Sequence, residues 1–513
     1  MKSATLVPAT TFLPEYCLVK GEITSVDPTA QPITFLAAFP TQWNKKLMQL
    51  GGGGWDGYLP DVTSDYNTGF RIATGPGSPV PLARGYVVMG DDSGHFGASS
   101  GPAGATMVSL KAGVDPLTWT LNDEMLHNFA HEHLKKAHDT VVALIKMRYA
   151  EPLRKTYFEG ASRGGGEAML VVQRYPADYD GVYAAMPSLG YVPAGLKRQQ
   201  IGRAMRANGG VGWISPAKAM LLYNAQITAC DGLDGVRDGL ISNVKACTFD
   251  PATLRCPDGR EAGDKCLSDA QLATIRIMFS RTSWNYDLAH GVRSAPAYLP
   301  GAALVSLLNT VGTTAQYSHD FVSMGNTHAL GDAFIRAVIL RNLDANTLSF
   351  DTKAPGKYLA SIQKASALFD ATNPDIRAFI RRGGKLIIVH GLADPLPMPT
   401  ATTEYYDNLV TRFGQSELDK SVRYYTVPGY GHGGGPFDVT HGGPRAYLDN
   451  PDSAVGGTPV LDALENWVEN GVAPGNLIAT AGTRTRPLCV YPAWPKYKGT
   501  GNVDQAANFD CVH

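Results

Sequence analysis

Four runs of apolar and β-branched residues each lead directly into a loop rich in glycine or proline. They span residues 47–50, 155–159, 385–390 and 422–427. Short runs of this kind are typical of strands that are buried in a parallel sheet. After the second run and a tight turn, residues 167–172 are compatible with a helix. The pattern predicts an α/β fold whose loops lie at the carboxyl ends of the strands, where open parallel sheets bind ligands.

The turn between the second run and the helix has the sequence Gly-x-Ser-x-Gly, residues 160–164. Between a strand and a helix this motif forms a nucleophile elbow, in which a strained turn raises the serine hydroxyl above the sheet. The glycines are needed because a Cβ would obstruct the close contact of strand and helix. The chain has 56 glycines, so the motif alone also fits an ordinary turn. The flanking strand and helix favour Ser162 as a nucleophile.

Two later loops offer the acid and the base that an activated serine needs. α/β-Hydrolases place them after the nucleophile, the aspartate first and the histidine second. Asp394 follows the run 385–390, and His432 lies in the glycine-rich loop after the run 422–427. Alone, Asp394 also fits a turn aspartate. Together with Ser162, we interpret these residues as a catalytic triad.

The first strand-like run leads into four glycines, residues 51–54. In α/β-hydrolases an early glycine-rich loop gives one backbone N–H to the oxyanion hole, and the residue after the nucleophile gives the other. We assign these donors to Gly53 and Arg163. A flexible turn is the alternative interpretation of the glycine run.

Length and spacing predict a second domain inserted into the hydrolase core. The 513 residues suffice for a full α/β core and one further domain. Positions 162 and 394 are 394 − 162 = 232 residues apart, more than a few βα units require. We predict an α/β-hydrolase fold whose core comprises residues 1–189 and 371–513. Residues 190–370 would form a lid domain over the strand ends, where specificity would reside.

The composition is that of an ordinary globular protein, with a net charge of −1. This charge gives no indication of a nucleic-acid or anionic-membrane partner. No run of 18 apolar residues predicts a transmembrane helix.

Six of the seven cysteines fall into three close pairs along the chain, and Cys17 is left over. The pairs are Cys230 with Cys247, Cys256 with Cys266, and Cys489 with Cys511, although six cysteines formally permit 15 connectivities. Their spacings match no zinc motif. Disulfides indicate an oxidising compartment, so we expect a secreted or periplasmic protein whose signal peptide has been removed.

The segment 230–241 places Asp231, Asp234 and Asp238 among glycines. Clustered carboxylate and carbonyl oxygens are the ligands that Ca²⁺ prefers. The loop is not an EF-hand, because the glycine at position 6 and the glutamate at position 12 are absent. A solvated acidic turn is the alternative, but a disulfide at Cys230 would pin the loop and favour a structural calcium site.

Together these segments resemble the tannase and feruloyl esterase family. The matching stretches are residues 13–17, 51–57, 92–95, 160–166, 173–181, 230–241, 390–395 and 428–436. The resemblance covers nearly the whole chain, and the acidic loop is its most specific element. It implies a serine carboxylic ester hydrolase acting on small aromatic esters, such as feruloyl, galloyl or phthalate-type monoesters.

The resemblance also implies roles for single residues. It assigns the triad to Ser162, Asp394 and His432, and it places His390 at the acyl pocket. It assigns the calcium ligands to the side chains of Asp231, Asp234 and Asp238 and to the carbonyls of Val236 and Leu240. In one respect the chain departs from the family pattern. A cysteine pair that typically ties the nucleophile turn to the histidine loop is replaced by Ala161 and Gly433.

Other functions fit the same residues. An acyltransferase or an amidase would use the same triad, and a non-catalytic, calcium-stabilised binding protein could keep the fold. A substrate with a free carboxylate would need a cation from the lid, for which Arg336 and Arg341 are candidates. Arginines at the surface or in ion pairs are the commoner explanation of such residues.

Overall fold

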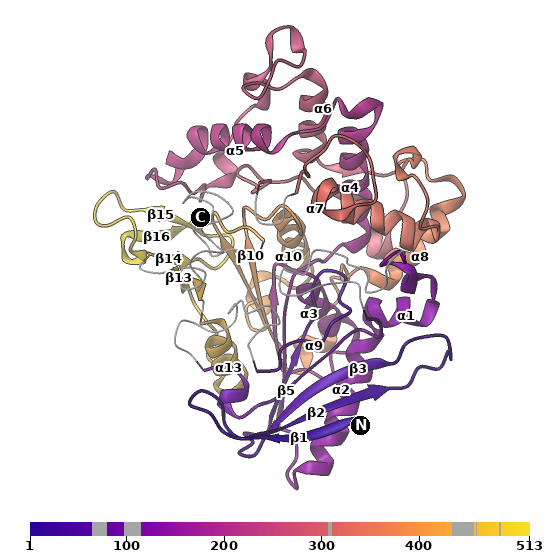
Figure 1. Cartoon of the computed structure of the whole chain (residues 1–513). Helices are drawn as coiled ribbons and strands as arrows, with labels where there is room; N and C mark the ends of the chain where they lie inside the picture. The colour runs from indigo at the N-terminus through magenta and orange to yellow at the C-terminus, as the bar shows by residue number, and fades with distance from the viewer. Residues whose placement is uncertain (64–78, 97–113, 306–309, 433–455, 458, 482–483) are drawn as a thin grey trace.

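A nine-stranded sheet with helices on both faces forms the centre of the structure (Figure 1). The structure is a computed structural model, and it describes residues 1–63, 79–96, 114–305, 310–432, 456–457, 459–481 and 484–513. In spatial order the strands are β1 (Ser3–Val7), β2 (Tyr16–Ile23), β3 (Ile33–Pro40), β5 (Val87–Asp91), β4 (Lys46–Leu50), β6 (Lys155–Ala161), β7 (Gly181–Ala185), β10 (Lys385–Gly391) and β11 (Val422–Val427). From β5 to β11 all neighbours are parallel, whereas β1, β2 and β3 pair antiparallel. The predicted α/β class is therefore confirmed, and the four predicted strands are β4, β6, β10 and β11.

Successive residues of the parallel strands alternate between two apolar layers, as the pleat of a strand requires. Tyr157 packs toward one face and Phe158 toward the other. The first face is covered by α13 (Val460–Asn470), whose Trp467 is buried against it. The second face is covered by α2 (His133–Arg148), α3 (Arg163–Arg174), α9 (Arg377–Arg381) and α10 (Pro399–Phe413). The short helix α11 (Gln415–Leu418) adds the buried Leu418 to the second layer. The short helix α1 (Asp123–His127) packs instead in the apolar cluster that contains most of the buried residues of 190–370.

The parallel register brings the predicted catalytic loops to one edge of the sheet. Leu50 at the end of β4 pairs with Glu159 of β6, and Ala161 pairs with Ala185 at the end of β7. Gly391 at the end of β10 pairs with Val427 at the end of β11. The loops that follow these strands therefore begin side by side.

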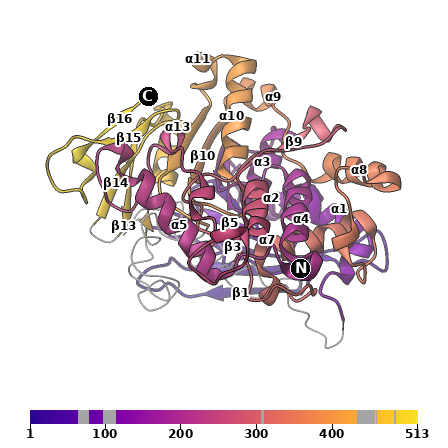
Figure 2. The same ribbon diagram turned by 90° about the horizontal axis from the view of Figure 1, so that it is seen from above.

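Residues 190–370, hereafter the insert, contribute no strand to the large sheet within the part that the structure describes. Their helices are α4 (Tyr191–Arg206), α5 (Pro216–Cys230), α6 (Asp269–Met278), α7 (Phe321–Phe334) and α8 (Leu359–Phe369). The two-residue strands β8 (Thr282–Ser283) and β9 (Ser294–Ala295) form a separate pair. These helices lie together at one end of the sheet (Figures 1 and 2). Their apolar cluster also takes in residues of the hydrolase core, among them Trp55, Trp119 and Phe129. The boundaries of the lid, residues 190–370, stay a prediction.

The last part of the chain leaves the large sheet and forms small antiparallel sheets at its side (Figure 2). Their strands are β12 (Gly456–Gly457), β13 (Leu477–Ala481), β14 (Arg484–Leu488), β15 (Trp494–Tyr497) and β16 (Phe509–Val512). From β14, Arg484 and Arg486 form ion pairs with Asp238 of the insert. The C-terminal segment, which we predicted to be part of the core, thus also contacts the insert.

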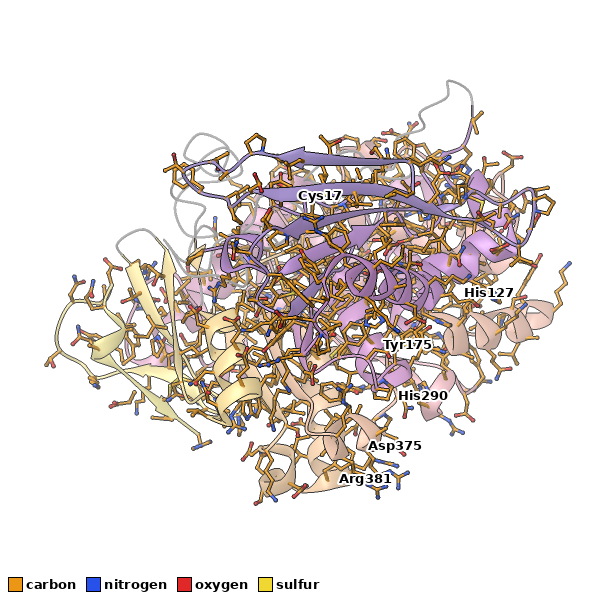
Figure 3. The ribbon with its side chains drawn as sticks, turned by 90° about the horizontal axis from the view of Figure 1, so that it is seen from below. Cys17, His127, Tyr175, His290, Asp375 and Arg381 are labelled. Carbon is orange, nitrogen blue, oxygen red and sulfur yellow. A yellow bond between two sulfur atoms is a disulfide. The ribbon has the colours of Figure 1, made fainter. Side chains whose placement is uncertain are left out.

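The three predicted cysteine pairs are confirmed as disulfides. They join Cys230 to Cys247, Cys256 to Cys266, and Cys489 to Cys511. Cys17 is a free cysteine on β2 (Figure 3). Among the described residues no helix is both long and apolar enough to cross a membrane.

Candidate active site

Ser162 occupies a strained turn between β6 and α3. Its backbone angles are φ 60° and ψ −118°, a region that side-chain-bearing residues rarely adopt. The strain is held by hydrogen bonds, since Ser162 N–H donates to Ala185 O and Ser188 N–H donates to Ser162 O. A Cβ on Gly160 would lie 2.3 Å from the carbonyl oxygen of Gly164, so only glycine fits that position. The turn has the geometry that the motif predicted.

The three residues of the predicted triad meet in the described part of the chain. His432 Nε2 lies 2.9 Å from Ser162 Oγ, and His432 Nδ1 lies 2.7 Å from Asp394 Oδ2. An imidazole that donates from Nδ1 to a carboxylate has an unprotonated Nε2 facing the serine. The arrangement is competent for proton transfer from the hydroxyl.

Asp394 is buried in the loop after β10, where its carboxylate is fixed from three sides. Besides His432, its Oδ1 accepts from Leu396 N–H at 2.8 Å, and His390 Nε2 lies 3.5 Å from Oδ2. Burial alone would raise the pKa of Asp394, but His432 and His390 outweigh it and hold that pKa below its usual value. The carboxylate is therefore ionised across the neutral range.

His390 is fully buried, and both of its ring nitrogens are bound within the protein. Nε2 donates to Pro397 O at 2.9 Å, while Nδ1 accepts from Thr402 Oγ1 at 2.8 Å. The structure therefore places this residue behind the Asp394 loop. We assign it to the support of that loop and do not include it among the groups that contact substrate.

The glycine run after β4 packs directly against the start of α3. Gly51 N–H donates to Glu159 O at 2.9 Å, and Gly52 N–H donates to Glu167 Oε2 at 2.8 Å. A Cβ on Gly164 would lie 2.5 Å from Gly52 O, which shows how closely loop and helix approach. Gly53 carries the next N–H along the loop, and Arg163 carries the first N–H of α3. The loop and the helix start are adjacent, as the predicted oxyanion hole requires.

The two candidate substrate arginines are engaged by residues of the insert and of the segment 115–123, which precedes it. Arg336 is buried and donates to Asp332 at 2.7 Å, to Leu343 O at 2.5 Å and to Asp115 at 3.1 Å. Arg341 donates to Asp123 at 2.9 Å and to Leu121 O at 2.6 Å. Both guanidinium groups hold segments together, which is the commoner use of such arginines.

The acidic loop follows α5 and is tied at its base by the Cys230–Cys247 disulfide. Asp231 accepts from Asp238 N–H and Gly239 N–H, both at 3.1 Å. Asp234 is completely buried, and its Oδ2 accepts no hydrogen bond. An orphaned, buried carboxylate oxygen fits a cation ligand. Asp238, by contrast, is bound to Arg484 and Arg486, with which a metal ion would compete.

A buried group of charged residues lies next to the nucleophile turn, and sequence reasoning missed it. It contains Asp56, Asp91, His133 and Glu167 together with the side chain of Arg163. The only indication in the sequence is the four-residue spacing of Arg163 and Glu167 at the start of an otherwise apolar helix, which places opposite charges on one face.

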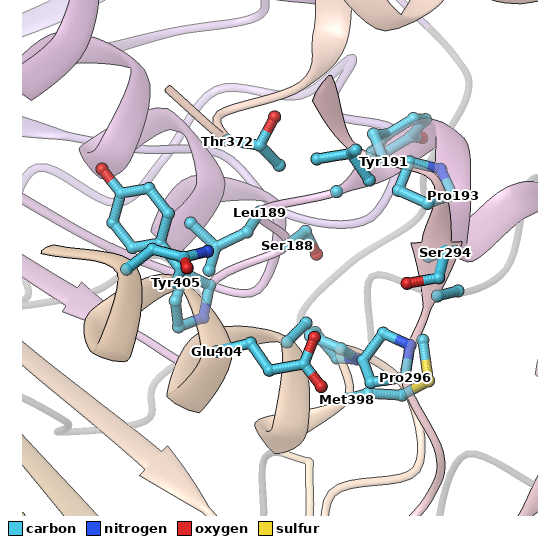
Figure 4. Close-up of a pocket in the computed structure, with 18 of the residues that line it drawn as sticks. Ser188, Leu189, Tyr191, Pro193, Ser294, Pro296, Thr372, Met398, Glu404 and Tyr405 are labelled. Atoms are coloured by element: carbon cyan, nitrogen blue, oxygen red, sulfur yellow. The ribbon is translucent and has the colours of Figure 1, made fainter. Parts of the chain in front are cut away.

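A cavity of about 110 Å³ lies between the insert and the core, close to the triad loops. Its walls include Ser188 after β7, Tyr191 at the start of α4, Met398 just before α10, and Glu404 of α10 (Figure 4). Ser162, Asp394 and His432 are not among the described residues that line it. The cavity is smaller than the pockets that hold drug-sized ligands, so it does not define a substrate.

Comparisons with known proteins agree with this geometry. The model of the tannase and feruloyl esterase family matches residues 17–512. The chain is 34% identical to an uncharacterized esterase of Agrobacterium fabrum, over 97% of this chain and 86% of that protein. It is 30% identical to the mono(2-hydroxyethyl) terephthalate hydrolase of Piscinibacter sakaiensis, over 98% of this chain and 85% of the relative. It is also 30% identical to a probable feruloyl esterase of Arthroderma benhamiae, over 92% of this chain and 81% of the relative.

Solved structures with little sequence identity share the fold. Feruloyl esterase B from Aspergillus oryzae superposes with a TM-score of 0.75 at 22% identity, covering 99% of this chain and 96% of that one. Gly433, which replaces a family cysteine, lies outside the described residues, whereas Ala161 ends β6. The chain belongs to the tannase and feruloyl esterase family.

Proposed function

We propose that this protein is a secreted serine carboxylic ester hydrolase that cleaves esters of aromatic acids through an acyl-enzyme. The single observation that carries the proposal is the pair of contacts that His432 makes, with Ser162 Oγ at 2.9 Å and with Asp394 at 2.7 Å. This is the hydrogen-bonded relay by which a neutral hydroxyl becomes a nucleophile at neutral pH.

In the acylation step Ser162 Oγ attacks the ester carbonyl carbon while His432 Nε2 takes its proton. Negative charge develops on the carbonyl oxygen, where the N–H groups of Gly53 and Arg163 donate hydrogen bonds. Collapse of the tetrahedral intermediate breaks the ester C–O bond, and His432 gives its proton to the departing alcohol. Asp394 keeps the imidazole in the required tautomer and stabilises the imidazolium.

Deacylation repeats these steps with water in place of the serine. His432 removes a proton from the water as it attacks the acyl carbon, and the same two N–H groups hold the oxyanion. Ser162 then leaves with the proton that His432 returns. The products are the carboxylic acid and the free enzyme.

The aromatic substrate class is proposed from the relatives. Those with printed activities act on a terephthalate monoester or are named as feruloyl esterases. The lining of the 110 Å³ cavity does not choose among them. Methyl ferulate, methyl gallate and mono(2-hydroxyethyl) terephthalate, compared at equal enzyme concentration, separate the three candidate classes by kcat/KM.

We also propose a structural calcium ion at the acidic loop. The ligands would be the side chains of Asp231, Asp234 and Asp238 and the carbonyls of Val236 and Leu240. The buried, unpartnered Oδ2 of Asp234 supports the site. The ion would hold three carboxylates in one loop of the insert and has no part in the chemistry. Three disulfides support an oxidising, secreted location.

The proposed function is tested by the hydrolysis of p-nitrophenyl acetate, which needs no specific acyl pocket. We expect turnover by the wild-type protein and none above background by folded Ser162→Ala. Equal turnover by both proteins would mean that Ser162 is not the nucleophile. No turnover by either protein on any of the four esters would contradict the assignment as an esterase.

A further inference from the structure

Five ionisable side chains from four segments meet beside the nucleophile turn. Asp56 follows the glycine run, Asp91 ends β5, His133 begins α2, and Arg163 and Glu167 lie one turn apart on α3. Their exposed fractions are 1%, 6%, 2%, 1% and 0%, respectively. Burying this many charges is costly unless each one is paired, so the arrangement calls for a reason.

Glu167 is the member that links the other four to the catalytic loops. Its Oε1 lies 3.4 Å from Arg163 Nε and 3.5 Å from His133 Nε2. Its Oε2 accepts the hydrogen bond from Gly52 N–H at 2.8 Å. One carboxylate therefore contacts two cations with one oxygen and the backbone of the glycine run with the other.

The charges in this group balance when Asp56 is neutral. Burial raises the pKa of Asp56 well above its usual value, and the neighbouring Glu167 carboxylate raises it further. Burial also acts to raise the pKa of Glu167, but His133 and Arg163 outweigh it and hold that pKa below its usual value. Two anions, Asp91 and Glu167, then face two cations, His133 and Arg163.

The Arg163 guanidinium is itself fixed, so it is a rigid partner for Glu167. Its Nη2 donates to Ala130 O at 2.8 Å and also to Phe129 O. The guanidinium carbon lies 4.6 Å from the centre of the Phe129 ring, within the range of a cation–π contact. The side chain of the residue after the nucleophile thus points away from the reaction and into this group.

We propose that Glu167 is a positioning residue for the oxyanion hole: by holding Gly52 N–H it aims the next N–H, that of Gly53, at the reacting carbonyl. The inference rests on the proposed function, since it assumes an oxyanion beside Ser162. Helix α3 then carries the nucleophile at its start, one oxyanion donor on Arg163, and the carboxylate that places the loop of the other donor. The positions of the nucleophile and of both oxyanion donors are therefore all fixed relative to α3.

The same group is not a metal site. Ligand atoms of Asp56, His133 and Glu167 do lie within 4.8 Å of one another. However, Glu167 is already bound by Gly52 N–H and faces the Arg163 guanidinium, and His133 Nδ1 is bound to Asp91 at 2.7 Å. Two fixed cations at this distance would repel a third.

Two substitutions of Glu167 separate positioning from charge pairing. Glu167→Asp keeps the negative charge but withdraws the carboxylate by one methylene, so Gly52 N–H loses its acceptor. Glu167→Gln keeps the length and an acceptor oxygen but removes the charge, which Asp56 can supply by ionising. If Glu167 acts by positioning Gly52, Glu167→Asp should be less active than Glu167→Gln. If it acts only through its charge, Glu167→Gln should be the less active of the two variants.

The readout is the hydrolysis of p-nitrophenyl acetate, with kcat and KM measured separately and the melting temperature recorded. Because a displaced oxyanion donor weakens binding of the transition state alone, Glu167→Asp should lower kcat by about 10- to 100-fold and change KM by less than about threefold. Glu167→Gln should stay within about fivefold of wild type in kcat. A reversed order of the two variants, or wild-type kcat in folded Glu167→Asp, would overturn the inference.

Glu465 offers a matched control at the other end of the strands. It accepts from Lys46 at 3.1 Å, from Arg84 at 2.6 Å and from Tyr86, so it also joins two segments through charged contacts. Glu465→Asp and Glu465→Gln should lower the melting temperature and leave kcat unchanged. A fall in kcat for these variants that equals the fall for Glu167→Asp would show that the loss is one of general stability, and would also overturn the inference.

A second variant keeps the test decisive if Glu167→Asp does not fold. Replacing Gly52 by glycolate through nonsense suppression removes the N–H donor and leaves every side chain in place. A lower kcat at unchanged KM supports the inference, and an unchanged kcat overturns it. Failure of the proposed function looks different, because wild type and Ser162→Ala would then be equally active or equally inactive.

Discussion

The catalytic edge of the sheet and the insert are built in different ways. At the catalytic edge, the parallel ladder fixes where each strand ends, and short loops then hold the functional groups. In the insert, side chains reach across long sequence distances. Arg206 binds Met324 O within the insert, and Arg336 binds Asp115 of the core. Disulfides close two loops of the insert.

This difference teaches where a substitution should act. At the catalytic edge the backbone ladder keeps the fold when a functional side chain is removed, so the loss should appear in the rate. In the insert, and at a buried ion pair such as His133 with Asp91, the side chains are themselves the connections, so the loss should appear in stability. Glu167 is different, because it also holds the backbone of the glycine run, and its replacement should appear in the rate. The predictions below test this division.

The largest effect is expected for the triad. Ser162→Ala should lower kcat by at least about 10⁴-fold, since only the oxyanion hole and substrate binding remain. His432→Ala should be about as damaging, and the double variant little worse than either single variant, because the two residues act as a unit. Melting temperatures of these variants close to that of wild type would confirm that the backbone hydrogen bonds of the parallel strands maintain the fold at this edge. Multiplicative losses in the double variant would contradict a shared relay.

A smaller effect, on stability, is expected for His133. Burial acts to lower its pKa, but Asp91 and Glu167 outweigh this and raise it to about 10. A histidine whose pKa is raised in the folded state contributes stability that is fully present below its unfolded value of about 6.5. That stability is lost as the pH rises through 10. His133→Gln should therefore melt well below wild type at pH 6.

The gap in melting temperature between wild type and His133→Gln should then narrow steadily up to pH 10. The ionisable groups around His133 are Asp91 and Glu167, which it contacts, and Asp56, His95 and His131, with Arg163 as the second cation on Glu167. Comparing the two proteins cancels other groups that titrate in the same range, such as buried Lys197, whose pKa burial lowers to about 7. A gap that is constant or widens with pH would contradict a charged His133.

The smallest effect is expected for calcium at the acidic loop. A chelator should lower the melting temperature by a few degrees, because an ion in 100-fold excess over its Kd contributes about 2.7 kcal/mol. Added Ca²⁺ should reverse the change, and Mg²⁺ should do so poorly, since it demands a smaller and more regular site. Asp234→Asn should melt like the chelated protein and no longer respond to the chelator. Identical melting curves with and without chelator would contradict the site.

Local motifs and pair spacings could be read from the sequence with success. The strand–turn–helix around Ser162 is encoded within a few residues, because glycine and serine have distinct steric requirements there. The three cysteine pairs could be predicted because the two cysteines of each pair are close in sequence and need only a short loop between them. That Asp394 and His432 meet at Ser162 could be predicted because chain order and strand ends together restrict where the partners of a serine can lie.

Contacts between distant segments could not be read in the same way. Arg336 carries the same charge whether it binds a substrate or Asp332, and only the packing decides between the two. The arginines that pair with Asp238 lie about half the chain away, in β14. Glu167 resembles any polar residue of an amphipathic helix until the glycine run is placed against it. Whether a charged side chain is buried depends on tertiary packing, which the local sequence pattern does not determine.

The most direct test of the account is to find where the acyl group resides. Wild-type protein mixed with p-nitrophenyl acetate should be quenched in acid within the first turnover, digested, and mapped by mass spectrometry. We predict one acetyl group on the peptide that contains Ser162, and none on that peptide in Ser162→Ala. Turnover with no acetyl group on Ser162, or with the group on another residue, would contradict the proposed acyl-enzyme.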